Sequence, residues 1–175
     1  REGEVWFAGE NVTNLPAHSR IRRGIAYTFQ ITAVYSNLSL AENLALALGN
    51  RDEARIRTAL DRVGLSERAS QTAGDLSYGH QRLLEIAMGV AQNTRLLILD
   101  EPTQGLAESD ISGFNALFKY LAGSRNILLI EHNMDVVMAL ADVITVLETG
   151  QILASGTPDE IRQNRAVQDA YLGTS

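Results

Sequence analysis

The sequence predicts an α/β fold in which a mostly parallel sheet has helices on both faces and carries a small helical insert. The first observation is a short, unbroken apolar run from Leu96 to Leu99, which is typical of a strand buried in such a sheet. The second is the alternation of strand and helix patterns from residue 96 onward, which favours parallel strands joined by helices. The third is a change to helical patterns between residues 31 and 75.

The composition is that of a soluble globular protein of ordinary size. The 175 residues suffice for one domain or one domain with a small insert, and 45% of them are hydrophobic. No apolar run is long enough to cross a membrane, and the start shows no signal-peptide pattern. The absence of cysteine excludes disulfides and thiolate metal sites, which fits a cytosolic protein. A net charge of −6 disfavours a broad nucleic-acid surface.

The front of the chain is predicted to be strand-rich. Residues 4–8 form a short predicted strand between glycine turns, and residues 20–23 form a basic turn. A strand of period two follows and ends at Gln30, because apolar residues alternate there with small or polar ones. The apolar residues are Ile25, Tyr27 and Phe29.

Two capped helices are predicted in the insert. Ser39 and Glu42 form a capping box that opens a helix ending near Leu48. Asp52 caps a second helix, which ends at Gly64 in the C′ position. The chain is therefore divided into a helical subdomain of residues 31–94 and an α/β core of residues 1–30 and 95–175.

A third helix is predicted to begin after Ser77, which is a suitable N-cap. Gly79 in its first turn is unfavourable for a plain helix, and it makes sense if a ligand approaches the backbone closely. A helix N-terminus with a hydroxyl and a glycine suits a phosphate. An ordinary capped helix is the alternative for this segment taken alone.

The remaining elements alternate between helices and strands. We expect a turn at 103–107, a helix ended by Gly123, buried strands at 127–130 and 143–147, a helix at 134–141, a hairpin strand at 151–154, and a last helix opened by Thr157, Pro158 and Glu160.

Polar side chains follow three of the predicted strands at the point where each strand ends. Asp100 and Glu101 follow the run at 96–99, and Gln30 and His132 follow two other strands. The carboxyl ends of parallel strands meet at one edge of a sheet, where ligands bind. One carboxylate can hold Mg²⁺ while the other takes a proton from water, which is the Walker B arrangement. A solvated acidic turn is the alternative for the two carboxylates alone, but three polar groups at one edge favour a site.

The order of these motifs resembles the ATP-binding cassette of ABC transporters, over essentially the whole chain. The collinear motifs are Gln30, Leu76 to Gly79, Leu96 to Pro102, and His132. Four segments are similar to the ATPase subunits of branched-chain amino-acid importers: Gly24–Gln30, Leu84–Ala87, Ile130–Met134 and Ala170–Gly173. The resemblance implies a P-loop NTPase-like fold.

The resemblance also implies a role for each motif residue. Gln30 would be the Q-loop glutamine and a ligand of Mg²⁺, and Asp100 would hold Mg²⁺ through water. Glu101 would orient or deprotonate the attacking water, and His132 would contact the γ-phosphate. The signature loop would grip the γ-phosphate bound on the opposite subunit, through Ser77, Tyr78, Gly79, His80 and Gln81.

Three features depart from the family pattern. His80 stands where the signature usually has Gln, although an imidazole can still donate a hydrogen bond. Ala107 stands where many D-loops, here residues 104–107, carry Asp, which would weaken signalling across the dimer. No G-x-x-x-x-G-K-[ST] motif occurs, and the only lysine, Lys119, lies on a predicted amphipathic helix.

The missing motif suggests an N-terminally incomplete cassette, because in the family the phosphate-binding loop precedes the segment with which this chain starts. We expect that the chain alone binds ATP weakly and does not hydrolyse it at a useful rate, because the loop and its lysine supply most of the grip on the phosphates. We also expect an exposed sheet edge and a tendency to self-associate.

The resemblance implies ATP and Mg²⁺ as cofactors and a peripheral location on the inner face of the cell membrane. The expected partners are transmembrane permease subunits and a second cassette, in a homodimer or heterodimer. A cytoplasmic helix of the permease would enter the groove beside Gln30 and the helical insert. No nucleic-acid partner is expected.

Three alternatives stay open at this point. A lipid or lipopolysaccharide exporter ATPase shares the Tyr-Leu-Gly ending at residues 171–173. The chain could also be a non-catalytic piece that completes the site of an intact cassette through Ser77. A soluble ABC ATPase of DNA repair or translation is disfavoured by the acidic balance and the lack of coiled-coil or basic segments.

Overall fold

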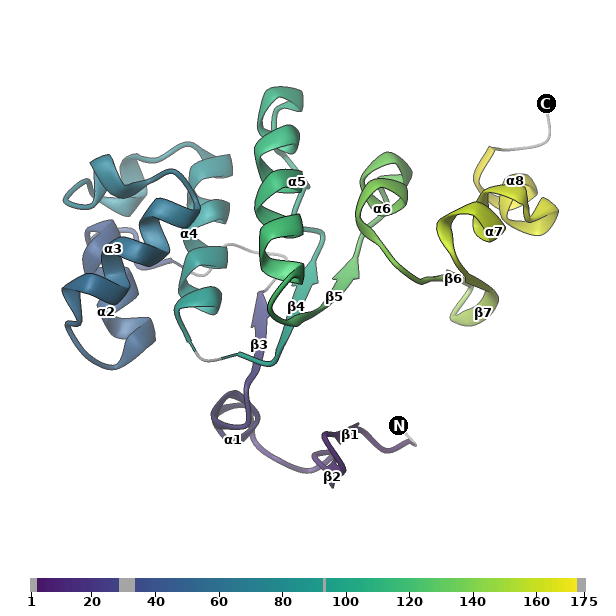
Figure 1. Cartoon of the computed structure of the whole chain (residues 1–175), viewed down its shortest axis with the longest axis horizontal. Helices are drawn as coiled ribbons and strands as arrows, with labels where there is room; N and C mark the ends of the chain where they lie inside the picture. The colour runs from purple at the N-terminus through teal and green to yellow at the C-terminus, as the bar shows by residue number, and fades with distance from the viewer. Residues whose placement is uncertain (1–2, 29–33, 93, 173–175) are drawn as a thin grey trace. The chain divides into compact units, whose positions relative to one another are not determined.

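A computed structural model describes residues 3–28, 34–92 and 94–172 of the chain (Figure 1). Its helices are α1 (Ala17–Arg22), α2 (Leu40–Leu48), α3 (Glu53–Arg62), α4 (Tyr78–Ala91), α5 (Glu108–Ala122), α6 (Met134–Leu140), α7 (Pro158–Gln163) and α8 (Arg165–Leu172). Its strands are β1 (Trp6–Phe7), β2 (Glu10–Asn11), β3 (Ile25–Thr28), β4 (Leu96–Asp100), β5 (Asn126–Ile130), β6 (Ile144–Glu148) and β7 (Gln151–Gly156). The chain divides into two compact units, Arg1–Ile130 and Glu131–Ser175, which are described separately below.

The first unit is built on a parallel sheet of order β3–β4–β5. Helix α4 packs on the side of this sheet that carries Ala26 and Leu97. A Cβ atom placed on Gly89 of α4 would lie 3.3 Å from the Leu97 side chain and 3.8 Å from Ala26 Cβ. This close approach of helix to sheet confirms the predicted α/β class with parallel strands and helices.

The opposite side of the same sheet leaves apolar side chains exposed. Tyr27, Leu128 and Ile130 are 44%, 50% and 45% exposed. The prediction of a buried strand at 127–130 is therefore wrong for Leu128 and Ile130. The prediction of a buried strand at 143–147 is wrong in the same way for Val143 and Leu147, which are also exposed. A short apolar run shows that one face is covered, but it does not show that both are. Self-association through an exposed sheet edge stays a prediction.

The helical segment forms as its caps predict. The Glu42 N–H donates to the Ser39 hydroxyl at 3.2 Å, the Ser39 N–H donates to Glu42 Oε2 at 2.9 Å, and the helix ends at Gly49 with a φ of 70°. The Arg55 N–H donates to Asp52 at 3.1 Å and fixes the start of α3. Both helices pack against α4, beside which they lie in Figure 1.

The front of the chain differs from its prediction. In place of one strand at 4–8, β1 and β2 form a short antiparallel hairpin that turns at Ala8 and Gly9, both with positive φ. The predicted basic turn at 20–23 belongs mostly to helix α1, which Pro16 opens with extended backbone. A helix of six residues is too short to show a clear apolar period.

The second unit contains α6, the β6–β7 hairpin, α7 and α8. Ile144 and Val146 on one face of the hairpin pack with Ile161 and Val167 from the two last helices. The capping box that opens α7 at Thr157 is present as predicted. In the described parts of the chain, every helix is too short or too polar to span a bilayer.

Candidate functional site

The predicted acidic pair lies at the carboxyl end of the central strand β4. Asp100 is the last residue of β4, and the N–H of Glu101 donates to the carbonyl of Ile130 at 2.8 Å. Glu101 has a φ of 46°, a left-handed conformation that costs a non-glycine residue about 1–2 kcal/mol. Backbone strain of this kind clusters at functional sites.

The Asp100 carboxylate is held by a tyrosine from the neighbouring strand. The hydroxyl of Tyr27 on β3 donates to Asp100 Oδ2 at 2.6 Å. This hydrogen bond is the main reason why the pKa of Tyr27 is raised, and burial and the charge of Asp100 act in the same direction. Loss of the phenol proton would bring two negative charges together, so the hydroxyl remains a donor that orients the carboxylate.

A buried ion pair joins helix α4 to the same aspartate. Arg82 is 1% exposed and donates through Nη1 to Glu85 Oε2 at 2.7 Å and through Nη2 to the main-chain carbonyl of Asp100. Burial makes an unpaired guanidinium very unfavourable, so the Glu85 carboxylate is required to neutralise it. The end of β4 is therefore fixed from β3 by Tyr27 and from α4 by Arg82.

The predicted signature residues form the first turn of α4. Ser77 is the N-cap, and its hydroxyl accepts a hydrogen bond from the His80 N–H at 3.4 Å. The His80 ring Nδ1 lies 3.0 Å from the same hydroxyl. The Gln81 side chain reaches back past the N-cap and donates to the carbonyl of Leu76 at 3.2 Å. The hydroxyl and the imidazole are thus the side chains paired at this helix end.

The first turn of α4 lies against the predicted D-loop. A Cβ atom on Gly105 would come within 3.0 Å of the Tyr78 ring, and Gly105 has a φ of 75°. Both facts favour glycine at this position, because another residue would be strained and would displace the ring. Gly79, next to the ring, is buried. The structure thus brings together the signature loop, the D-loop and, through Arg82, the acidic pair.

Two predicted site residues stand apart from this group. Gln30 lies outside the described residues. His132 lies in the second unit and is described within that unit alone, where its side chain is exposed and its N–H donates to Glu131 Oε2 at 2.9 Å. The buried Glu131 carboxylate also accepts a hydrogen bond from the Asn133 N–H at 3.2 Å, so it fixes the turn that carries His132.

In the described ranges, no group of three His, Asp or Glu side chains could hold a metal ion.

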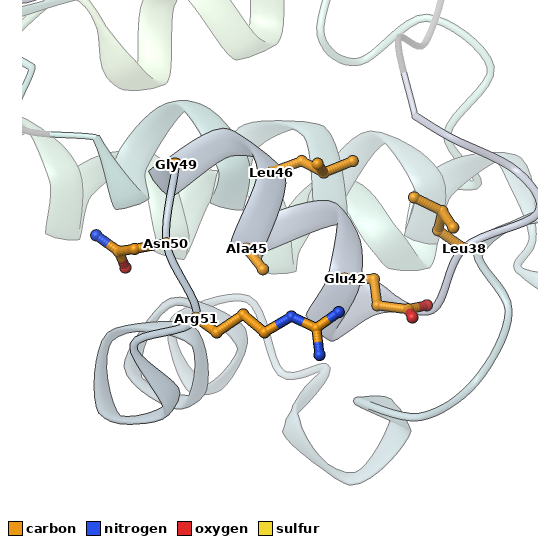
Figure 2. Close-up of a pocket in the computed structure, with 7 residues that line it drawn as sticks. All are labelled: Leu38, Glu42, Ala45, Leu46, Gly49, Asn50 and Arg51. Carbon is orange, nitrogen blue, oxygen red and sulfur yellow. The ribbon is translucent and has the colours of Figure 1, made fainter.

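A groove of about 360 Å³ runs along helix α2 (Figure 2). Leu46 is 55% exposed and contributes apolar surface, whereas Glu42 and Arg51 contribute opposite charges. Figure 2 shows the Arg51 side chain extending toward Glu42. The pKa of Glu42 is lowered first by the Ser39 backbone N–H, then by the Ser39 hydroxyl, and also by Arg51. The remaining lining residues are Leu38, Ala45, Gly49 and Asn50.

Two family models match this chain. The model of the ABC transporter matches residues 1–104, and that of the branched-chain amino acid ATP-binding cassette transporter matches residues 151–175. The high-affinity branched-chain amino acid transport ATP-binding protein BraF of Pseudomonas aeruginosa is 37% identical, over 98% of this chain and 76% of BraF. The chain belongs to the ABC transporter ATP-binding cassette family.

Other relatives agree with this assignment of the cassette. The high-affinity branched-chain amino acid transport ATP-binding protein LivG of Escherichia coli K12 is 35% identical over 98% of the cassette and 76% of LivG. The lipopolysaccharide export system ATP-binding protein LptB of the same organism is 29% identical over 98% of the cassette and 74% of LptB. A crystal structure of the cassette MJ1267 in its ADP conformation has a TM-score of 0.84 and 25% identity, covering 99% of this chain and 78% of that one. The predicted family and fold are confirmed.

The sequence reasoning missed several residues that position the site. Arg82 and Glu85 carried a readable signal, because they are opposite charges spaced i, i+3 on the buried face of an otherwise apolar helix. Glu131 was not predicted as a positioning residue, although it lies beside His132 in the segment Ile130–Met134. Tyr27 gave no such signal, because its contact with Asp100 depends on the pairing of two strands far apart in sequence.

Replacing Arg82 with Met should lower the free energy of unfolding of the cassette by about 3–5 kcal/mol, because the buried Glu85 carboxylate would lose the guanidinium with which it forms an ion pair. Replacing Arg82 with Met and Glu85 with Leu together should cost clearly less, since both charges are then removed. Arg57→Met, at an exposed position on α3, should change stability by less than about 0.5 kcal/mol. Urea unfolding followed by circular dichroism measures all three. A double variant as unstable as Arg82→Met would contradict this account.

Proposed function

We propose that this cassette is the ATP-hydrolysing subunit of an importer for branched-chain amino acids. The observation that carries the proposal is the arrangement around Asp100, in which a strand-end carboxylate pair, the signature loop and the D-loop lie in one unit of a cassette related to BraF and LivG. In operation it would sit on the inner face of the membrane as a dimer with a second cassette, bound to permease subunits.

The proposed chemistry assigns one task to each residue. Asp100, with Gln30, would hold Mg²⁺ through water, and the ion would supply charge neutralisation at the phosphates. Oxygen donors of this type fit Mg²⁺, and Tyr27 already restricts the carboxylate of Asp100. Glu101 would take a proton from the attacking water. The water oxygen would bond to the γ-phosphorus while the bond between that phosphorus and the ADP oxygen breaks. His132 would donate a hydrogen bond to a γ-phosphate oxygen.

The signature loop would act on the partner cassette's nucleotide. The Ser77 hydroxyl and the N–H groups of the first turn of α4 are suited to a phosphate, because a helix N-terminus carries partial positive charge. His80 would add an imidazole donor beside them. Tyr78, Gly79 and Gln81 would shape this loop rather than carry charge.

The groove along α2 is the proposed contact for a cytoplasmic helix of the permease. Its surface combines leucine side chains with a carboxylate and a guanidinium, which suits an amphipathic helix with polar ends. The groove lies on the helical segment, and Gln30, the other part of the expected docking region, lies outside the described residues.

A chimeric cassette tests the proposed hydrolysis. Joining a Walker A segment of this family to residue 1 should give a protein that releases phosphate from ATP. Glu101→Gln in this chimera should lower kcat at least about 100-fold, because the general base is lost while size is kept. Glu53→Gln on α3 is the matched control and should leave kcat unchanged. Equal activity of the Glu101→Gln and control chimeras would refute the assignment of Glu101.

The 175-residue chain by itself should neither hydrolyse ATP at a useful rate nor bind it more tightly than about millimolar, since its sequence offers no glycine-rich loop with lysine to cradle the phosphates. Isothermal calorimetry with ATP and Mg²⁺, paired with a phosphate-release assay, measures both. Saturable binding well below millimolar would overturn this expectation.

A second candidate is a non-catalytic cassette that completes the site of an intact one. The observation behind it is the N-terminus of α4, where the Ser77 hydroxyl and the first-turn N–H groups suit a phosphate bound by a partner cassette. Adding the chain to an intact cassette should then change the ATPase rate of that cassette, and Ser77→Ala should remove the effect. Ser70→Ala, at an exposed position outside the helix cap, is the control. An unchanged rate on mixing rules this candidate out.

A further inference from the structure

Two arginines donate hydrogen bonds to main-chain carbonyls at the C-terminal end of helix α4. Arg55 of α3 donates through Nη2 to the carbonyl of Ala91 at 2.8 Å. Arg125, directly before β5, donates through Nη1 to the Thr94 hydroxyl at 2.8 Å and to the carbonyl of Val90 at 3.5 Å. Because Val90 and Ala91 are consecutive, these contacts bring the two guanidinium groups to neighbouring carbonyls.

A third arginine and an exposed tyrosine complete this group. The Arg62 guanidinium carbon lies 5.7 Å from the centroid of the Tyr120 ring. The pKa of Arg125 is lowered, first by burial and then by the nearby charge of Arg62. We call Arg55, Arg62, Arg125 and Tyr120 the arginine cluster.

The guanidinium groups of the arginine cluster lack carboxylate partners within the described residues. None of its three guanidinium groups forms an ion pair with a carboxylate of those residues. The carbonyls at the end of α4 supply only about half of one negative charge against three positive ones. The buried Nε of Arg125 has no hydrogen-bond partner, whereas the Asp52 carboxylate is used to cap α3. The three guanidinium groups are therefore available to carboxylates of another molecule.

The arginine cluster is accessible and lies away from the acidic pair. Arg55 and Arg62 are exposed, and Tyr120 is 58% exposed. Arg125 directly precedes the amino end of β5 and Thr94 lies two residues before that of β4, whereas Asp100 is at the carboxyl end of β4. The two groups therefore lie at opposite edges of the parallel sheet.

We propose that the arginine cluster is a docking site for an acidic segment of a partner protein. Planar guanidinium groups bind carboxylates through paired hydrogen bonds, and arginine and tyrosine are enriched in protein interfaces. A short acidic segment fits better than nucleic acid or an anionic membrane, because the net negative charge of the chain repels an extended polyanion. Bound carboxylates would connect α3, α5 and the start of β5, and this role does not depend on ATP hydrolysis.

Titration of the 175-residue chain against fluorescein-labelled hexaglutamate, followed by fluorescence anisotropy, tests the proposal. Binding should saturate and should weaken in high salt. Arg62→Gln should weaken it roughly two- to fivefold, and the pair Arg55→Gln and Arg62→Gln about tenfold. Arg57→Gln removes the same charge from an exposed position on α3 and should leave the affinity unchanged.

Three outcomes would overturn the proposal. An equal loss in Arg57→Gln and Arg62→Gln would mean that only overall charge matters. Displacement of hexaglutamate by inorganic phosphate at similar concentration would indicate a small-anion site. Binding to phosphatidylglycerol vesicles, but not to hexaglutamate, would indicate a membrane contact.

Thermal melting followed by circular dichroism verifies that each variant is folded. Tyr120→Ala replaces any arginine variant that fails to fold, and it should also weaken hexaglutamate binding.

Discussion

A single buried guanidinium connects the parts of the proposed site. Arg82 lies in the interior with Glu85, and it binds the main-chain carbonyl of Asp100. The strand that carries the acidic pair and the helix that carries the signature loop therefore cannot move independently without breaking a desolvated contact. Because this contact uses the backbone of Asp100, it does not occupy the carboxylate, which accepts the hydrogen bond from Tyr27.

Helix α4 presents different chemistry at its two ends. Its N-terminus, capped by Ser77, offers backbone N–H groups suited to a phosphate, and Tyr78 packs there against Gly105. Its C-terminus has carbonyls that attract the guanidinium groups of Arg55 and Arg125. The dipole of one helix thus favours an anion at one sheet edge and a cationic cluster at the other.

Local sequence signals predicted the elements that depend on nearest neighbours. The caps at Ser39 and Asp52 form as expected, because a side chain and an N–H three residues apart need no distant partner. The expectation of fully buried strands failed at Leu128, because burial depends on what covers each face. The front hairpin was missed because strands of two residues show no periodicity.

The sequence by itself determined the order and chemical identity of the motif residues, and this was sufficient to predict the family and the parallel α/β fold. The tertiary structure alone decided which groups meet: Tyr27 with Asp100, Arg82 with the end of β4, and Arg55 and Arg125 with carbonyls at the end of α4. The physical reason is that caps and periods are set by residues within a turn or two of each other. Strand register and helix packing, in contrast, join segments up to 73 positions apart, and no local pattern encodes them.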